Sequence, residues 1–124
     1  MAESPAPART AAFARGLAAE AAAATLLERQ GFTVLARRVR TPRGEIDLIA
    51  RRAGLVVFVE VKARARIDYA AESIGARQRR RIAGAAEIWL AAHPELAGLD
   101  LRFDVVLAAP GRAPQHLPGA FEAD

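Results

Sequence analysis

The sequence predicts an α/β domain in which a mixed β-sheet is flanked by helices, in the order α-β-β-β-α-β. Apolar residues recur at helical spacing in two long segments, 9–30 and 74–92, whereas four shorter segments have the apolar pattern of strands. The first three strands follow one another closely, and the fourth comes after the second helix. Neighbouring strands pair antiparallel and a helical crossover gives a parallel pair, so we expect both kinds of pairing.

The chain has the size and composition of one domain. Its 124 residues are 52% hydrophobic and 26% charged, with a net charge of +4 and no cysteine. We expect residues 1–8 to be a flexible lead and residues 9–124 to be a single domain. Without cysteine there is no disulfide and no thiolate metal site. No apolar run could span a bilayer and the first residues lack the apolar core of a secretory signal, so we expect a cytoplasmic protein with no membrane partner.

The first predicted helix, 9–30, is rich in alanine, which favours helix formation. A stripe at helical spacing predicts the side that packs on the sheet, and it carries Phe13, Leu17, Ala24 and Leu27. Gly31 follows the stripe and is expected to end the helix as a C-cap.

Three strands are predicted after this helix, at 32–39, 45–51 and 55–62, with a turn at Thr41-Pro42-Arg43-Gly44. The alternation of the second strand predicts two sides, Ile46 and Leu48 against Glu45, Asp47 and Ile49. The third strand likewise predicts two faces, Val57, Val59 and Val61 against Phe58, Glu60 and Lys62.

The second helix is predicted over 74–92, with Ser73 as its N-cap and Trp89 in the core. The last strand is predicted over 101–108. The Gly/Pro-rich segment 110–119 is expected to be a loop before a short tail.

The hairpin of the second and third strands predicts which residues lie opposite one another. If Ala53-Gly54 is a two-residue turn, Arg52 pairs with Leu55. Counting back along the ladder, Ile49 faces Phe58, Asp47 faces Glu60 and Glu45 faces Lys62. A longer loop would change this register, but the carboxylates of each strand share a face in any register.

Two opposed carboxylates repel each other unless a cation neutralises them. Carboxylate oxygens are the ligands that Mg²⁺ and Mn²⁺ prefer, and Mg²⁺ usually takes one or two of them and keeps its waters. Of the 18 basic residues 17 are arginine, and the one lysine, Lys62, stands two residues after Glu60. Its compact ammonium could orient a water or stabilise charge on a phosphate. The alternative is an ordinary surface ion pair with Glu60.

Glu20 falls between Leu17 and Ala24, inside the apolar stripe of the first helix. A carboxylate on an inward side is costly unless it is paired or binds a metal, so it could join the acidic cluster as a third carboxylate. The alternative is that Glu20 is simply a good helix former at the rim of a weak stripe.

The hairpin motif resembles the signature of the YraN family, a group of small bacterial proteins classed with endonucleases. The resemblance rests on Gly44-Glu45-Ile46-Asp47-Leu48-Ile49 and on Phe58-Val59-Glu60-Val61-Lys62-Ala63-Arg64. It extends to the helix with Glu20, to the Arg-rich start of the second helix and to Arg102-Phe103-Asp104-Val105, over roughly 12–121.

The resemblance implies a restriction-endonuclease-like core, as in the PD-(D/E)xK nucleases and the archaeal Holliday-junction resolvases. It implies metal-assisted hydrolysis of a phosphodiester, in which Asp47, Glu60 and the backbone carbonyl of Val61 hold Mg²⁺ or Mn²⁺, with Glu20 as a further candidate. Lys62 would orient the nucleophile and stabilise the transition state. Ile46 stands where the superfamily motif has proline. Two roles stay open for Glu45, a partner of Lys62 or a second metal ligand.

Arginines flank this cluster in the sequence and indicate a phosphate-binding surface. Cations at a helix N-terminus oppose the helix dipole, so the run at the start of the second helix does not serve helix stability. The candidate nucleic-acid contacts are Arg43, Arg64, Arg66, Arg77, Arg79, Arg80 and Arg81. The alternative is a solvated charged surface. Because no base-reading helix motif is present, we expect recognition of backbone and shape, and Tyr69 is given no role.

The remaining polar residues are expected to be structural. His93 and His116 have no partner at metal-ligand spacing and are given no role, and Arg102 with Asp104 is interpreted as a structural ion pair.

Three functions fit the sequence. The first is a metal-dependent nuclease acting on DNA, including branched or structured DNA, and a homodimer would let so small a domain reach both strands. The second is a nucleic-acid-binding module on a nuclease fold that does not cut. The third is an interaction protein whose basic surface binds an acidic partner, and only this one predicts no salt-sensitive affinity for DNA.

Overall fold

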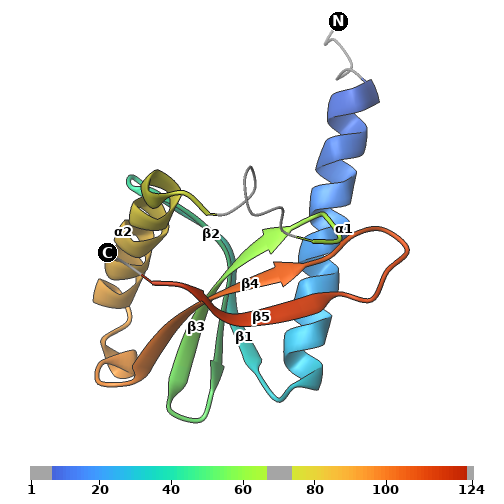
Figure 1. Cartoon of the computed structure of the whole chain (residues 1–124). Helices are drawn as coiled ribbons and strands as arrows, with labels where there is room; N and C mark the ends of the chain where they lie inside the picture. Colours follow the sequence, from blue (N-terminus) through green and yellow to red (C-terminus); the bar gives the residue numbers. More distant parts are fainter. Residues whose placement is uncertain (1–6, 67–73, 123–124) are drawn as a thin grey trace, which may run out of the picture.

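A computed structural model describes residues 7–66 and 74–122 (Figure 1). The helices are α1 (Pro7–Arg29), α2 (Ala76–Ala91) and the single 3₁₀ turn η1 (Pro94–Leu96). The strands are β1 (Thr33–Thr41), β2 (Gly44–Arg52), β3 (Leu55–Lys62), β4 (Asp100–Leu107) and β5 (Gln115–Phe121). No helix in the described part of the chain is long and apolar enough to cross a membrane.

The five strands form one mixed sheet in the order β1-β2-β3-β4-β5. Only β3 and β4 pair in parallel, across the connection that contains α2, and the other neighbours are antiparallel. The expected mixed α/β architecture is therefore confirmed. The loop expected at 110–119 is confirmed over 110–114 and is wrong beyond them, because β5 begins at Gln115. As an edge strand it tolerates Pro118, whose missing N–H would break a central ladder.

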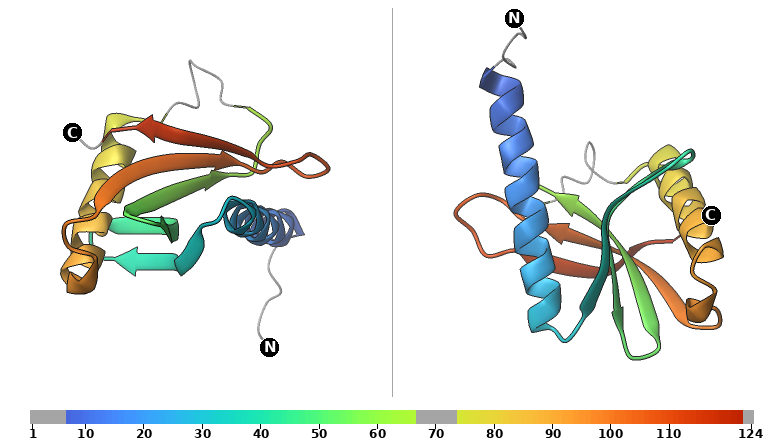
Figure 2. Two further views of the ribbon diagram at one scale, coloured as in Figure 1. Left: turned by 90° about the horizontal axis from the view of Figure 1, so that it is seen from below. Right: turned by 180° about the vertical axis from the view of Figure 1, so that it is seen from behind.

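The two helices cover opposite sides of the sheet (Figures 1 and 2). The core on the α2 side is built around Phe58, Ile82 and Trp89, which are buried. The core on the α1 side is built around Leu27 and Val57. The predicted faces of β3 are confirmed, because Phe58 packs on the α2 side and the β3 valines 57, 59 and 61 on the α1 side.

Only the second half of α1 packs on the sheet. Ala24 and Leu27 of the predicted stripe are buried, whereas Phe13 is 60% exposed and Leu17 is 41% exposed. The prediction that all four face the core is wrong for these two, because the first half of α1 extends past the strands (Figures 1 and 2). The helix ends as expected before Gly31, whose φ of 88° suits glycine.

The predicted alternation of β2 is also wrong. Ile46 packs in the core on the α2 side, while Leu48 packs on the α1 side. The ladder between β1 and β2 pairs Arg37 with Leu48, and then Val39 with Ile46, and Arg38 between them has a φ of 51°. This left-handed residue interrupts the pleat, and Asp47 lies opposite the interruption.

Helix α2 begins two residues later than predicted. Its N-cap is Gly75, without a side-chain cap, so the predicted N-cap role of Ser73 is wrong, and Ser73 itself lies outside the described residues. Trp89 packs in the core as predicted, edge-on to Phe58, and its ring stacks on His93 at 3.9 Å.

Candidate functional site

The hairpin of β2 and β3 has the predicted turn. Arg52 pairs with Leu55 across Ala53-Gly54, and Ile49 pairs with Phe58. The ladder ends at the pair of Leu48 with Val59. The predicted pairings of Asp47 with Glu60 and of Glu45 with Lys62 therefore lie beyond the backbone ladder.

Beyond this point a side chain takes the place of the backbone partner. The backbone N–H of Val61 donates to Oδ2 of Asp47 at 2.7 Å. On the other edge of β3, the carbonyl of Lys62 accepts from the N–H of Ala108. Since successive strand residues direct their backbone groups to opposite edges, the carbonyl of Val61 is directed to the β2 side, together with its N–H. Val61 thus presents both backbone groups to the Asp47 carboxylate region.

Glu60 lies beside Asp47 with two donors of its own. Nζ of Lys62 lies 3.3 Å from Oε1 of Glu60, and Nε2 of Gln78 from α2 donates to the same oxygen at 3.1 Å. The side chains of Glu60 and Lys62 are only 14% and 17% exposed. This is a largely buried pair, so it differs from the ordinary surface ion pair considered for Lys62.

The pKa values of both carboxyl groups are raised. Burial and the charge of Glu60 raise the pKa of Asp47 to about 7, against the opposing effect of the Val61 N–H. Burial also raises the pKa of Glu60, although Lys62, Gln78 and a hydrogen bond with Asp47 act to lower it. The carboxyl groups therefore lie within hydrogen-bonding reach of each other, and their burial favours the protonated form.

The other two predicted carboxylates have arginine partners. Oε2 of Glu20 accepts from Nε of Arg38 at 2.8 Å, and Oε1 of Glu45 lies 3.3 Å from Nε of Arg40. Glu45 therefore does not have the expected contact with Lys62, because it faces Arg40 across the β1–β2 ladder. Among the described residues no group of three or more acidic or histidine side chains is arranged to hold a metal ion. Glu20 still contributes to the electrostatic field at Asp47.

A groove of about 530 Å³ opens over Asp47 and Glu60. Its walls come from the β1–β2 turn and from α2, and the lining residues are Thr41, Pro42, Arg43, Gly44, Glu45, Gln78, Arg81 and Ile82. Two of the predicted nucleic-acid contacts, Arg43 and Arg81, line this groove. Cationic walls around a carboxylate pair suit a substrate that is itself an anion.

The β1–β2 turn is held against α2 by close contacts. Oγ1 of Thr41 accepts from the N–H groups of Arg43 and Gly44, which closes the turn. The Arg43 side chain lies across Gly84, where an added Cβ would lie 2.5 Å from Nε, and its Nη1 lies 3.3 Å from Glu87. Arg43 therefore has a structural contact in addition to its place at the groove.

The remaining predicted arginines lie around the same end of the sheet. Arg77 and Arg80 are exposed on the first turns of α2, and Arg79 is half-buried there. Arg64 and Arg66 follow the end of β3. Their predicted contacts with nucleic acid stay predictions, and Tyr69 lies outside the described residues.

The sequence interpretation missed Gln78 because it stands inside the arginine run. The sequence does contain a signal for it. A glutamine in the first turn of the helix that follows Glu-x-Lys can reach the glutamate of that motif.

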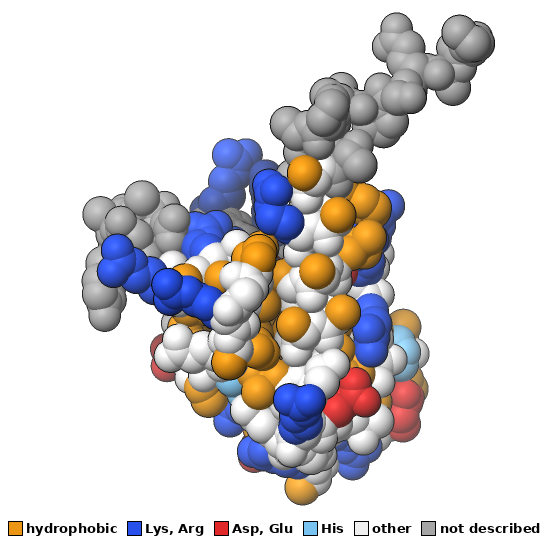
Figure 3. All heavy atoms as spheres, turned by 90° about the vertical axis from the view of Figure 1, so that its right-hand side faces the viewer, with side chains coloured by type: hydrophobic (Ala, Val, Ile, Leu, Met, Phe, Trp, Pro, Cys, Tyr) orange, Lys and Arg blue, Asp and Glu red, His pale blue; other side chains and the backbone are white. Residues whose placement is uncertain are grey.

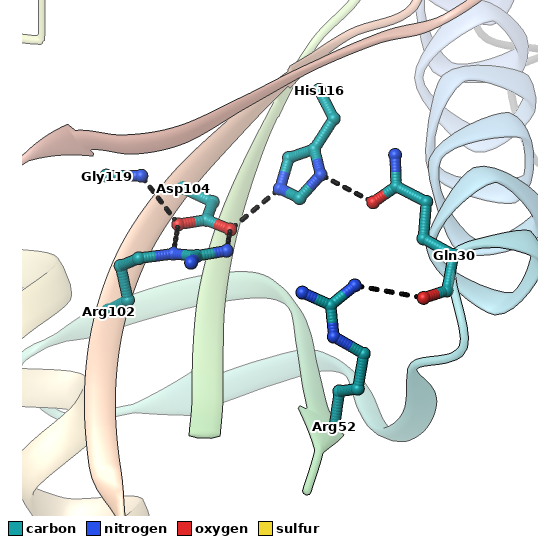
Figure 4. Close-up of polar contacts among 6 residues, drawn as sticks. All are labelled: Gln30, Arg52, Arg102, Asp104, His116 and Gly119. Atoms are coloured by element: carbon teal, nitrogen blue, oxygen red, sulfur yellow. Dashed lines mark hydrogen bonds and ion pairs between the residues drawn. The ribbon is translucent and has the colours of Figure 1, made fainter. Parts of the chain in front are cut away.

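The interpretation also missed His116. This residue belongs to a buried cluster on β4 and β5 (Figure 4). Arg102 donates twice to Asp104, at 2.8 and 2.9 Å, which confirms the predicted ion pair. His116 Nε2 lies 2.7 Å from Asp104 Oδ2, and its Nδ1 lies 2.7 Å from Oε1 of Gln30 at the end of α1. His116 therefore has a structural role that its isolation in the sequence concealed.

The sequence belongs among proteins that are similar over almost their whole length. The model of the uncharacterised protein family UPF0102 matches residues 19–108. The UPF0102 protein RPA0323 of Rhodopseudomonas palustris (strain ATCC BAA-98 / CGA009) is 60% identical over 116 residues, which cover 94% of this chain and 89% of that protein. The UPF0102 protein BRADO0179 of Bradyrhizobium sp. (strain ORS 278) is 59% identical over 117 residues, with 94% and 83% covered.

Proposed function

The chain belongs to the uncharacterised protein family UPF0102, which is the YraN family of the sequence resemblance, and we propose that it is a metal-dependent nuclease that hydrolyses phosphodiester bonds of DNA. One observation carries the proposal. Two largely buried carboxyl groups with raised pKa values, Asp47 and Glu60, lie next to the one lysine of the chain. We also propose that the sheet and its helices form a restriction-endonuclease-like core, and the order of the elements along the chain supports this.

The donor set fits a divalent cation. Burial and the charge of Glu60 both raise the pKa of Asp47, and a cation between the two carboxylates would favour their ionised forms. The Val61 carbonyl, directed to the same side, would add a neutral oxygen. Two carboxylates and a carbonyl leave positions for water, as Mg²⁺ and Mn²⁺ sites of this class require. A bound ion would supply hydroxide near neutral pH and offset charge on the phosphate.

The residues of the chain would then have distinct tasks. Lys62, held at 3.3 Å by Glu60, directs its ammonium to the same side of β3 and stabilises negative charge that develops on the phosphate. Gln78 fixes Glu60 from α2 and leaves its second oxygen for the ion. Arg43 and Arg81 bind the phosphates that flank the scissile bond.

The test is cleavage of branched and linear DNA in Mg²⁺ or Mn²⁺ by the wild type and by Lys62→Ala. We expect the rate to fall by about 10²–10³-fold, because the substitution removes a charge that acts in the transition state. The matched control is Asp100→Asn, an exposed carboxylate at the start of β4, which should cleave like the wild type. Equal, metal-independent cleavage by all three proteins would refute the proposed nuclease activity.

The pairing of Glu20 with Arg38 favours a second candidate, because Glu20 then does not join Asp47 and Glu60 as the third carboxylate of the acidic cluster. This candidate is a module that binds nucleic acid and does not cut it. It predicts salt-sensitive DNA binding that is unchanged by Lys62→Ala in the absence of any cleavage.

A further inference from the structure

The first half of α1 carries an exposed aromatic ring. Phe13 is 60% exposed, whereas Phe32, Phe58 and Phe121 are buried. Leu17, one turn further along the same side of the helix, is 41% exposed. A space-filling view of this helix shows hydrophobic side chains along its length and arginines on both sides of it (Figure 3). Phe13 and Leu17 thus form a small exposed apolar surface on this half of the helix.

The ring of Phe13 lies next to a cation. Cζ of Arg38 lies 5.4 Å from the centroid of the Phe13 ring, and Nε of Arg38 is bonded to Glu20. Arg38 is itself the left-handed residue of β1, with a φ of 51°. Few arginines adopt this conformation, and here it directs the guanidinium towards α1 and away from the regular pleat.

This ring and cation are continuous with the candidate site. Phe13 and Glu20 are seven residues apart on one side of α1, which is roughly 10 Å along the helix. A hollow lined by Glu20, Arg38, Arg40, Glu45, Ile46 and Asp47 extends from Arg38 to the catalytic carboxylate. The hollow holds about 80 Å³, which is too small for a nucleotide, so a strand with its phosphate at Asp47 would pass over it towards Phe13.

We propose that Phe13 and Arg38 form a stacking platform for an unpaired base of the nucleic acid strand that enters the Asp47–Glu60 site. The proposal rests on the proposed function and names the substrate class, which is DNA with a single-stranded segment. Every unpaired base offers a flat surface to an aromatic ring, whereas a blunt duplex keeps its bases stacked inside. Arg38 pairs with Glu20 and Arg40 pairs with Glu45, so the platform depends on stacking against the ring and the guanidinium and not on unpaired positive charge.

The test is the affinity for a labelled 20-nucleotide oligothymidine and for a blunt duplex, measured by fluorescence anisotropy in EDTA so that cleavage plays no part. We expect Phe13→Ala and Phe13→Leu each to weaken binding of the single strand by about tenfold, and to leave duplex binding unchanged. The leucine variant keeps an apolar side chain and removes only the aromatic ring. The matched control is Leu101→Ala, which removes a side chain that is 49% exposed at the start of β4 and should change neither affinity.

Three results would overturn the proposal. They are a wild type that does not bind the single strand, an unchanged affinity in both Phe13 variants, and a loss that is equal for single strand and duplex. Sedimentation of the same proteins tests a second copy of the chain as the occupant. If Phe13→Ala converts a dimer into a monomer without changing the affinity for the single strand, the surface is a dimer interface. Absence of cleavage with Phe13-dependent binding would refute the nuclease alone, and cleavage without Phe13-dependent binding would refute the platform alone.

Discussion

Two buried acidic clusters in the same sheet have opposite electrostatic character. At the β4–β5 edge Asp104 is fully buried, and Arg102, His116 and the N–H of Gly119 all bond to it. Burial acts to raise its pKa, but these hydrogen bonds outweigh burial and lower the pKa to about 2. At the end of the β2–β3 hairpin, burial and Glu60 raise the pKa of Asp47 to about 7.

The difference separates a structural carboxylate from a candidate functional one. The chain supplies every partner that the charge of Asp104 needs, so that cluster is complete. Lys62 and Gln78 bond to Glu60, and Asp47 accepts from the N–H of Val61, so the pair has one cationic partner for two carboxyl groups. Buried carboxylates with raised pKa values are more frequent at functional sites than elsewhere, and the two clusters of this sheet illustrate the contrast.

The largest effect should follow from breaking the complete cluster. Asp104→Asn leaves Arg102 without its counter-ion and His116 without a carboxylate acceptor, and we expect a loss of about 3–5 kcal/mol in the free energy of unfolding. Urea denaturation measures this, with Asp100→Asn on the same strand as the exposed control. A loss below 1 kcal/mol would mean that the cluster contributes little to stability.

Acid should weaken the wild type through the same residue. The pKa of Asp104 is lowered from 3.8 to about 2 on folding, so its contribution is complete above pH 4 and disappears as the pH falls to 2. We expect this loss to lower the free energy of unfolding by about 2 kcal/mol as the pH falls over this range. Unfolding curves from pH 5 to 2 test this, and Asp104→Asn should lose less stability than the wild type over the same interval. Parallel curves for both proteins would contradict the assignment.

The smallest effect has the opposite sign. The pKa of Asp47 is raised on folding, so its charge costs stability as the pH rises from 4 through 7. Asp47→Asn should therefore be more stable than the wild type at pH 8, by about 1–2 kcal/mol after allowance for its partial exposure, and the difference should vanish near pH 4. Glu45→Gln is the matched control, because it makes the same change of carboxylate to amide at an exposed position of the same strand. A destabilised Asp47→Asn at pH 8 would remove the contrast between the clusters.

The hairpin could be predicted from the sequence because its signals are local. Ala53-Gly54 between two apolar strands determined the register of Ile49 with Phe58, and the alternation of β3 put Glu60 and Lys62 on one side. These local signals are enough to predict that Glu60 and Lys62 share one side of β3, next to the strand that carries Asp47.

The missed features depend on contacts between distant segments. The reversal at Arg38 depends on its partner Glu20 in another element, and no local pattern indicates a left-handed arginine. His116 acquires its role from Asp104 across a strand pair and from Gln30, 86 residues away. The stripe with Phe13 has the correct helical spacing. How far the sheet extends beneath α1 depends on the whole fold, so the spacing alone does not show which end of the stripe is buried.

Gly84 has a consequence for how this chain can vary. The space left by its missing side chain is occupied by Arg43, so any larger residue at 84 would displace the guanidinium. Arg43 lines the groove over Asp47 and Glu60, so a glycine of α2 that is not itself part of the groove wall leaves room for one of the cations of that wall.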